Sequence, residues 1–150
     1  MPGIEEEVKG KFDSEQHKAV VNVMFTAGWL KSGHTADMAP YGLSPQQFNI
    51  LRILRGAKGT LMSMQDVKCR MIDRSPNATR LADKLLAKGL MERERCEEDR
   101  RVVYVRITPK GLDLLKRMDQ EVWGHFKEEY ERLSANEART LNRLLDKLRG

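Results

Sequence analysis

The segment from residue 75 to residue 107 constrains the fold more than any other, because it joins an amphipathic helix directly to two β-like runs. Ser75 and Pro76 are typical of a helix start, and Gly89 is typical of a helix end. Between them, apolar residues recur at the i, i+3, i+4, i+7 and i+8 spacing of a helix with one buried face. These residues are Ala78, Leu81, Ala82, Leu85 and Leu86.

The opposite face of this helix is polar and carries Asn77, Thr79, Arg80, Asp83 and Lys84. Side chains of these types can hydrogen-bond base edges and phosphates. Just upstream, the capping-box spacing of Ser63 and Asp66 predicts a short helix over about 63–71. Two short helices joined by a few residues, the second with a basic polar face, predict a helix-turn-helix unit.

Two β-like runs follow, Leu90 to Arg95 and Val102 to Ile107, and the second is rich in β-branched residues. They are joined by a charged segment, Cys96 to Arg101, which predicts a hairpin with a charged tip. Strand alternation would direct Arg93 at a carboxylate of the facing strand. We therefore expect Arg93 to have a structural role.

Helices are also predicted before this unit. Apolar residues at helical spacing predict a long helix over 14–32 that ends near Gly33. Ser44 and Gln47 have capping-box spacing with Pro45 between them, and they predict a second helix that stops at Gly56 and Gly59.

After the hairpin, Thr108 and Pro109 are expected to begin one long helix whose apolar positions continue to Tyr130. Ser134 and Glu137 then have capping-box spacing before a last helix with a leucine stripe. Trp123, Phe126 and the stripe from Leu141 to Leu148 are candidates for contact with a second subunit. The alternative is that they pack on the helix at 14–32 within the same chain.

The net charge of +5 is concentrated in one part of the chain. Residues 51–110 hold 15 basic and 8 acidic side chains, whereas residues 1–50 hold 4 and 6, and residues 111–150 hold 8 of each. A basic segment between an acidic start and a neutral end is typical of a polyanion-binding site. The alternative is a solvated basic face.

The 150 residues, 40% of them hydrophobic, predict a single domain that can bury a core without disulfides or metals. Two cysteines far apart, Cys69 and Cys96, suit a reducing compartment. No apolar run approaches the roughly 18–20 residues of a membrane span, and Glu5 to Glu7 do not suit a secretory signal. We therefore expect a cytoplasmic protein. The absence of phosphate-cradling, metal-spaced and nucleophile motifs predicts no enzyme activity, cofactor or metal.

Four segments, in this order, resemble the winged helix-turn-helix core of the multiple antibiotic resistance regulator (MarR) family. They are Arg74 to Leu81, Lys88 to Arg93, Asp99 to Arg101 and Ile107 to Leu112. The resemblance implies a mainly α fold with a small β-hairpin (α+β). It also implies a single MarR-type domain over 1–150, with a DNA-binding core at about 40–112. Dimerisation helices would occupy about 3–35 and 112–149.

The resemblance also assigns candidate DNA-binding residues. Arg101, supported by Asp99, would enter the minor groove from the wing, with Arg100 beside it. Arginine suits the negative potential of a narrow minor groove, and a helix N-terminus attracts phosphate. The major-groove set would be Ser75, Pro76, Asn77, Thr79, Arg80 and Lys84.

The expected function is therefore sequence-specific transcriptional regulation by a homodimer that binds a near-palindromic duplex and acts as a repressor. A winged-helix module for protein contact or non-specific DNA binding is the alternative. The family implies a small aromatic or phenolic effector, for which Trp29, His34 and Tyr41 are positional candidates. Organic-peroxide-sensing members use a cysteine near the N-terminus, whereas the first cysteine here is Cys69. Peroxide sensing is therefore not expected.

Overall fold

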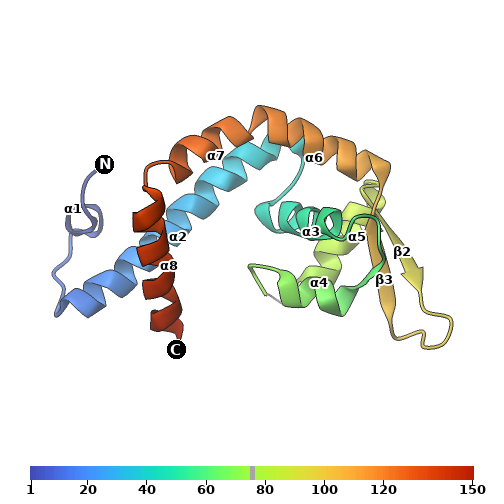
Figure 1. Cartoon of the computed structure of the whole chain (residues 1–150), viewed down its shortest axis with the longest axis horizontal. Coiled ribbons are helices and arrows are strands. Elements are labelled where there is room, and N and C mark those ends of the chain that lie inside the picture. The colour runs from blue at the N-terminus through green and yellow to red at the C-terminus, as the bar shows by residue number, and fades with distance from the viewer. Residues whose placement is uncertain (75–76) are drawn as a thin grey trace.

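The computed structural model describes residues 1–74 and 77–150. A winged core formed by the middle of the chain lies beneath long helices from its two ends (Figure 1). The first half contains α1 (Ile4–Val8), α2 (Glu15–Met38), the 3-10 turn η1 (Ala39–Tyr41), α3 (Pro45–Gly56), β1 (Met62–Ser63) and α4 (Met64–Arg70). The second half contains α5 (Ala78–Ala87), β2 (Met91–Arg95), β3 (Val103–Ile107), α6 (Pro109–Glu121), α7 (Trp123–Tyr130) and α8 (Ala135–Arg149).

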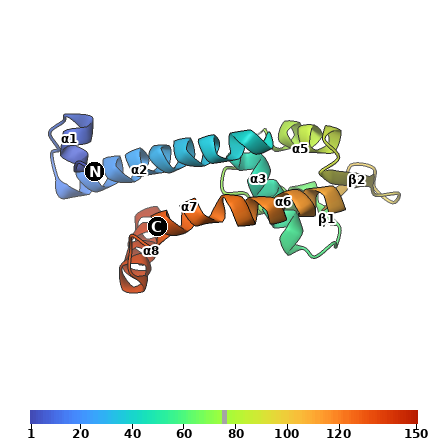
Figure 2. The ribbon, with the colours of Figure 1, turned by 90° about the horizontal axis from the view of Figure 1, so that it is seen from above.

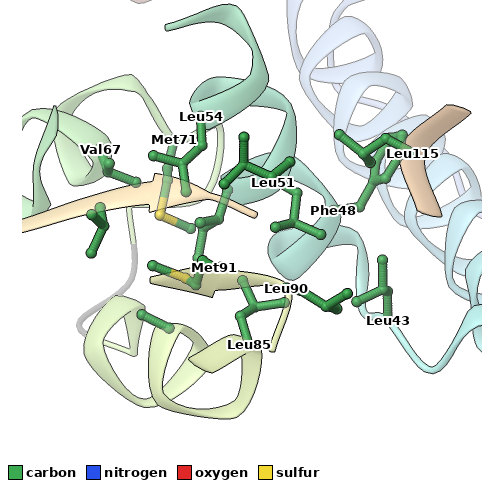
Figure 3. Packing of buried hydrophobic residues seen from close by; sticks show 14 of the residues in the cluster. Leu43, Phe48, Leu51, Leu54, Val67, Met71, Leu85, Leu90, Met91 and Leu115 are labelled. Atoms are coloured by element: carbon green, nitrogen blue, oxygen red, sulfur yellow. The ribbon is translucent and has the colours of Figure 1, made fainter. Parts of the chain in front are cut away.

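The core is formed where α3, α4 and α5 meet the sheet and the inner face of α6 (Figure 3). The predicted inner faces are confirmed, because Ala78, Ala82 and Leu85 of α5 are buried. Burial of each large aliphatic side chain contributes about 1.5–3 kcal/mol. The largest fully buried side chains are Ile50, Leu51, Leu54, Val67, Leu85, Val105, Leu115 and Met118.

The sheet has three antiparallel strands in the order β1-β3-β2. The predicted hairpin is confirmed: Met91 pairs with Ile107, and Arg95 pairs with Val103. The two-residue strand β1 was not predicted. It adds to the free edge of β3, with Met62 opposite Val105, and a run this short has no periodicity of its own to reveal it.

Local start signals place the helices accurately. The Ser44–Gln47 and Ser134–Glu137 capping boxes both form, with side chain and backbone bonded in each direction. Ser63 Oγ accepts the Asp66 N–H at the start of α4. The expected N-cap of the recognition helix, Ser75, lies outside the described residues together with Pro76. The helix is described from Ala78 onward.

A close backbone approach joins the sheet to α6. Gly89 has φ of +69° and ends α5 in the left-handed conformation that glycine adopts readily. Thr108 Oγ1 donates to the Gly89 carbonyl at 2.7 Å and accepts the Gly111 N–H at 3.1 Å. A Cβ at position 111 would lie 2.3 Å from the Leu90 carbonyl oxygen, so this packing requires glycine.

Two predictions about the terminal helices were wrong. α2 does not end near Gly33 but continues to Met38, because Pro40 is the first residue that disfavours further helix. Packing of the extra turn also outweighs the roughly 1 kcal/mol cost of a glycine in a helix.

The helix predicted over residues 109–130 is interrupted at Val122. The His125 N–H donates to the Val122 carbonyl at 3.1 Å, an i→i+3 bond that tightens the backbone between α6 and α7. Val122 and Phe126 are both buried on the inner side of this junction. Helical periodicity in the sequence continues across the break and does not reveal it.

α2 and the α6–α7 run lie alongside each other, and α1 and α8 lie at the end away from the hairpin (Figures 1 and 2). Phe126 packs within the chain, 4.6 Å from the His34 ring centroid, so it is not available to a second subunit. Trp123 and three leucines of α8 remain exposed. In the described ranges, no helix is long and apolar enough to cross a membrane.

Candidate DNA-binding surface

The outward face of α5 is polar, as expected. Thr79, Arg80 and Lys84 are exposed, whereas the apolar face of the helix is buried against the core. Asn77 precedes the helix and is also exposed. Of the six residues expected in the major groove, these four therefore lie on or beside one accessible face.

The connection from α4 to α5 is held by side chains of α3. The Ile72 N–H donates to Asn49 Oδ1 at 2.9 Å, and Gln46 Nε2 donates to Asp73 Oδ2 at 2.6 Å. Met71 is buried in the core. These contacts fix the position of the second helix relative to the first, and neither α3 side chain was singled out from the sequence. Polar side chains on the partly exposed side of α3 have no periodicity that would distinguish them.

At the tip of the hairpin, Asp99 fixes the orientation of Arg101. Asp99 Oδ1 accepts the Arg101 backbone N–H at 3.1 Å and Arg101 Nε at 3.0 Å, and Asp99 Oδ2 accepts Arg101 Nη2 at 3.3 Å. The Arg101 side chain and then its backbone N–H lower the pKa of the Asp99 carboxyl. The Arg101 side chain is still 91% exposed. It is thus oriented by Asp99 while its guanidinium stays accessible, and Arg100 beside it is exposed as well.

The prediction for Arg93 was wrong about its partner. Arg93 Nη1 lies 3.5 Å from Asp83 Oδ1 of the recognition helix, and the facing strand is not involved. The cross-strand ion pair is instead formed by Arg106 Nε and Glu92 Oε2, 2.9 Å apart. Arg93 is paired with the buried Val105 and therefore lies on the sheet face that packs against α5, where Asp83 provides the carboxylate.

A hollow of about 410 Å³ connects the helix and the wing. It lies between α4, α5 and the hairpin, and its walls include Thr79, Asp83, Arg93 and Arg101. Residues from both predicted DNA-contacting segments therefore line one concave surface with exposed cations at its rim.

The model of the MarR family matches residues 43–103. The multiple antibiotic resistance protein MarR of Salmonella typhimurium is 31% identical over 112 residues, which cover 74% of this chain and 76% of that protein. The chain belongs to the MarR family. Several other curated relatives match over only about half of their own length.

Solved structures agree with this assignment. A MarR transcription factor from Planctomyces limnophilus is 34% identical, has a TM-score of 0.70, and matches over 91% of this chain and 98% of that one. A mutant E. coli MarR complexed with operator DNA shares the fold, with a TM-score of 0.76 at 24% identity over 93% of this chain and 99% of that chain. As a member of the MarR family, the protein is a transcriptional regulator and not an enzyme.

The three MarR-type effector candidates do not form one site. Trp29 is covered by the Arg132 guanidinium, 5.8 Å from its ring, and His34 packs on Phe126. Tyr41 donates its hydroxyl to Glu121 Oε2 at 2.5 Å, and this hydrogen bond raises the pKa of Tyr41.

Tyr41 lines a cavity of about 540 Å³ between η1, the end of α5 and α6. Leu90 and Leu114 form apolar parts of its wall, and Lys88, Lys110 and Arg117 add positive charge. The described residues contain no cluster of three metal-ligating side chains. Cys69 is exposed, and Cys96 is half-buried.

Proposed function

We propose that this regulator is a homodimeric repressor that binds a near-palindromic operator and is released by a small aromatic effector. The observation that carries the proposal is the pairing of two exposed basic elements on one surface. Arg80 and Lys84 project from the recognition helix, and Arg101 projects from the wing with its geometry set by Asp99. An exposed arginine on each element suits simultaneous contact with adjacent major and minor grooves.

Residues 75–77, 79, 80 and 84 are proposed to contact the major groove. Arg101, oriented by Asp99 and with Arg100 beside it, is proposed to enter the minor groove. In this proposal, residues of about 40–112 bind DNA, and the helices within about 3–35 and 112–149 form the dimer. The DNA complex of the E. coli protein with the same fold supports this use of the winged core.

Surface area supports the dimer. A compact monomer of this mass would expose about 7,800 Å², whereas the chain exposes 10838 Å². Much of the exposed apolar surface lies on the terminal helices, where Met24 is 69% exposed and Leu144 is 49% exposed. Two copies related by a two-fold axis would cover these faces and place two recognition helices one DNA turn apart, roughly 34–36 Å.

The cavity beside Tyr41 supports the effector. Its aromatic and aliphatic walls suit an apolar ring. Its three cations outnumber its one carboxylate, Asp113, and suit a ligand that is phenolate or carries an acidic group. Arg117 lies 5.2 Å from the centre of the Tyr41 ring, and the Lys88 ammonium donates to the Gly42 carbonyl. A ligand that displaced these contacts would alter the junction between η1 and the winged core.

The decisive experiment for DNA recognition is selection of binding sites from random duplexes. A symmetric motif is expected, with an affinity that falls by a factor on the order of 10³ or more between 50 and 200 mM salt. An equal affinity for all duplexes would favour the non-specific module instead, and a flat salt response would mean that the basic segment is only a solvated face. Sedimentation that shows a monomer at micromolar concentration would contradict the dimer.

The effector is tested with the selected duplex. A panel of benzoate and phenol derivatives should include compounds that release the duplex, and Arg117→Ala should reduce their potency at least tenfold without changing DNA affinity. Lys116→Ala, on the same helix but outside the cavity lining, is the matched control. Equal potency against both variants would exclude this cavity as the effector site.

A further inference from the structure

One apolar side chain of the winged core is fully presented to solvent. Ile72 is 90% exposed, the highest value among the large hydrophobic residues described as exposed. The others of that group lie outside residues 43–107, on the N-terminal segment, on α2 and in the part of the chain from α6 onward. Isolated exposed apolar residues are common on proteins, so exposure alone does not identify Ile72 as a binding residue.

Ile72 lies in the connection between α4 and the recognition helix. The N-terminal end of a recognition helix is the part that enters the major groove. Ile72 lies five residues before Asn77 and is therefore close along the chain to the proposed major-groove residues.

The backbone at Ile72 is fixed, although its side chain is free. Its N–H is bonded to Asn49 Oδ1, and the next residue, Asp73, is bonded to Gln46. The preceding residue, Met71, has extended backbone angles and is buried. Adjacent residues in an extended segment point in opposite directions, so burial of Met71 directs Ile72 outward.

The charge around Ile72 is net positive and favours DNA as the partner. Arg70 and Arg74, two residues before and after it, are both exposed, whereas the one carboxylate between them, Asp73, is half-buried and accepts a hydrogen bond from Gln46. Cations at these positions attract phosphates, and Ile72 between them would be brought to the base edges. In the major groove, the C5-methyl group of thymine is the apolar feature that distinguishes one base from another. A β-branched side chain also loses little rotamer freedom when it is fixed in a contact.

We infer that Ile72 is a specificity-determining residue that contacts the methyl group of one thymine in each half of the operator. This inference rests on the proposed operator-binding function and adds an apolar contact to its polar and charged ones. It predicts that one position of the selected motif is read through shape and methyl contact, without a hydrogen bond.

The test compares thymine with deoxyuridine, which lacks only the methyl group. Sites are first selected from random duplexes with the wild-type protein and with Ile72→Ala. Ile72→Ala should select the same motif except for relaxed preference at one thymine per half-site. Replacing that thymine with deoxyuridine should weaken wild-type binding about fourfold for each half-site, as expected for burial of one methyl group. The same replacement should change the affinity of Ile72→Ala less than twofold.

Ile72→Val, which keeps the β-branch, should retain most of the deoxyuridine effect. Leu112→Ala, a matched loss of exposed aliphatic surface on α6, should behave as wild type. Unfolding midpoints of the variants should agree, because Ile72 contributes no buried surface. An identical motif with Ile72→Ala, or a uniform loss of affinity for all duplexes, would overturn the inference and leave the proposed function standing. Failure of the wild-type protein to select any motif would overturn both.

Discussion

The winged core and the terminal helices differ in where their apolar side chains lie. In the described part of residues 43–107, Ile72 is the one large hydrophobic residue that is fully exposed, and most of the others form or pack against a continuous core. On α2 and α8, in contrast, the helical stripes face solvent at Val20, Met24, Leu141 and Leu144. The core is thus largely buried within one chain, whereas the terminal helices leave apolar side chains exposed, as the proposed dimer requires.

The same substitution in both regions tests this difference directly. Leu85→Ala should destabilise the protein by about 2–5 kcal/mol, because it empties a fully buried position. Leu144→Ala should instead have a cost that depends on protein concentration, because in the proposed dimer Leu144 packs against the second subunit. Urea unfolding measured at protein concentrations of 1 and 100 μM would distinguish the two variants. A concentration-independent loss at Leu144 would contradict the proposed dimer contact.

Substitution of one glycine in the winged core and one in α2 tests the same difference between the two regions. Gly111→Ala should destabilise by about 1–3 kcal/mol, because the added Cβ would overlap the Leu90 carbonyl and Ile107. Gly28→Ala in α2 meets no atom within 4 Å in the single chain, so it should stabilise the helix by about 0.5–1 kcal/mol. Thermal unfolding checks both variants. Destabilisation by Gly28→Ala would indicate that a second subunit packs closely against that position.

The sequence was sufficient wherever a local interaction decides the structure. Ser44 and Ser134 cap their helices through residues three positions away, so each start was predictable from a few letters. The buried face of the recognition helix followed from its spacing for the same reason. The family resemblance supplied the candidate DNA-binding residues, and the Asp99–Arg101 contact was expected because the two residues are near neighbours.

The features that the sequence did not predict depend on distant contacts. β1 exists through pairing with β3, and Arg93 bonds Asp83 because α5 packs beside β2. The break at Val122 interrupts a helical pattern that the sequence continues. Likewise, the cavity beside Tyr41 is formed by η1, the end of α5 and α6, which are far apart in the sequence. The partners of β1, of Arg93 and of Tyr41 in its cavity come from other elements, so no local pattern encodes them.

Within the core, the recognition helix should contribute more to base specificity than the wing. Arg80→Ala should weaken operator binding by roughly 1–3 kcal/mol and relax base preference at one position per half-site, as expected for a guanidinium that contacts a guanine edge. Repeating the duplex selection with the variant measures both effects. If affinity and motif were both unchanged, Arg80 would not be a base-contacting residue.

The wing arginine should give a smaller effect of a different kind. Arg101→Ala should weaken binding and reduce the preference for A·T-rich flanks, because groove width and potential depend on A·T content more than on base identity. The core motif should stay the same in a selection with this variant. A changed core motif would mean that the wing does not lie in the minor groove.

Asp99→Ala should have the smallest effect on DNA binding, since Asp99 orients Arg101 without contacting DNA through its charge. The Arg101 side chain and backbone lower the Asp99 pKa from its ordinary value of 3.8. The carboxylate is therefore fully ionised above the ordinary value, and its hold on Arg101 is lost only as the pH falls through the still lower pKa of the folded protein. The ratio of wild-type to Asp99→Ala affinity should accordingly stay constant between pH 5 and 8. Binding titrations across that range check this expectation, and a ratio that changed more than twofold would show that another titrating group, and not the Asp99 carboxylate, controls the wing arginine.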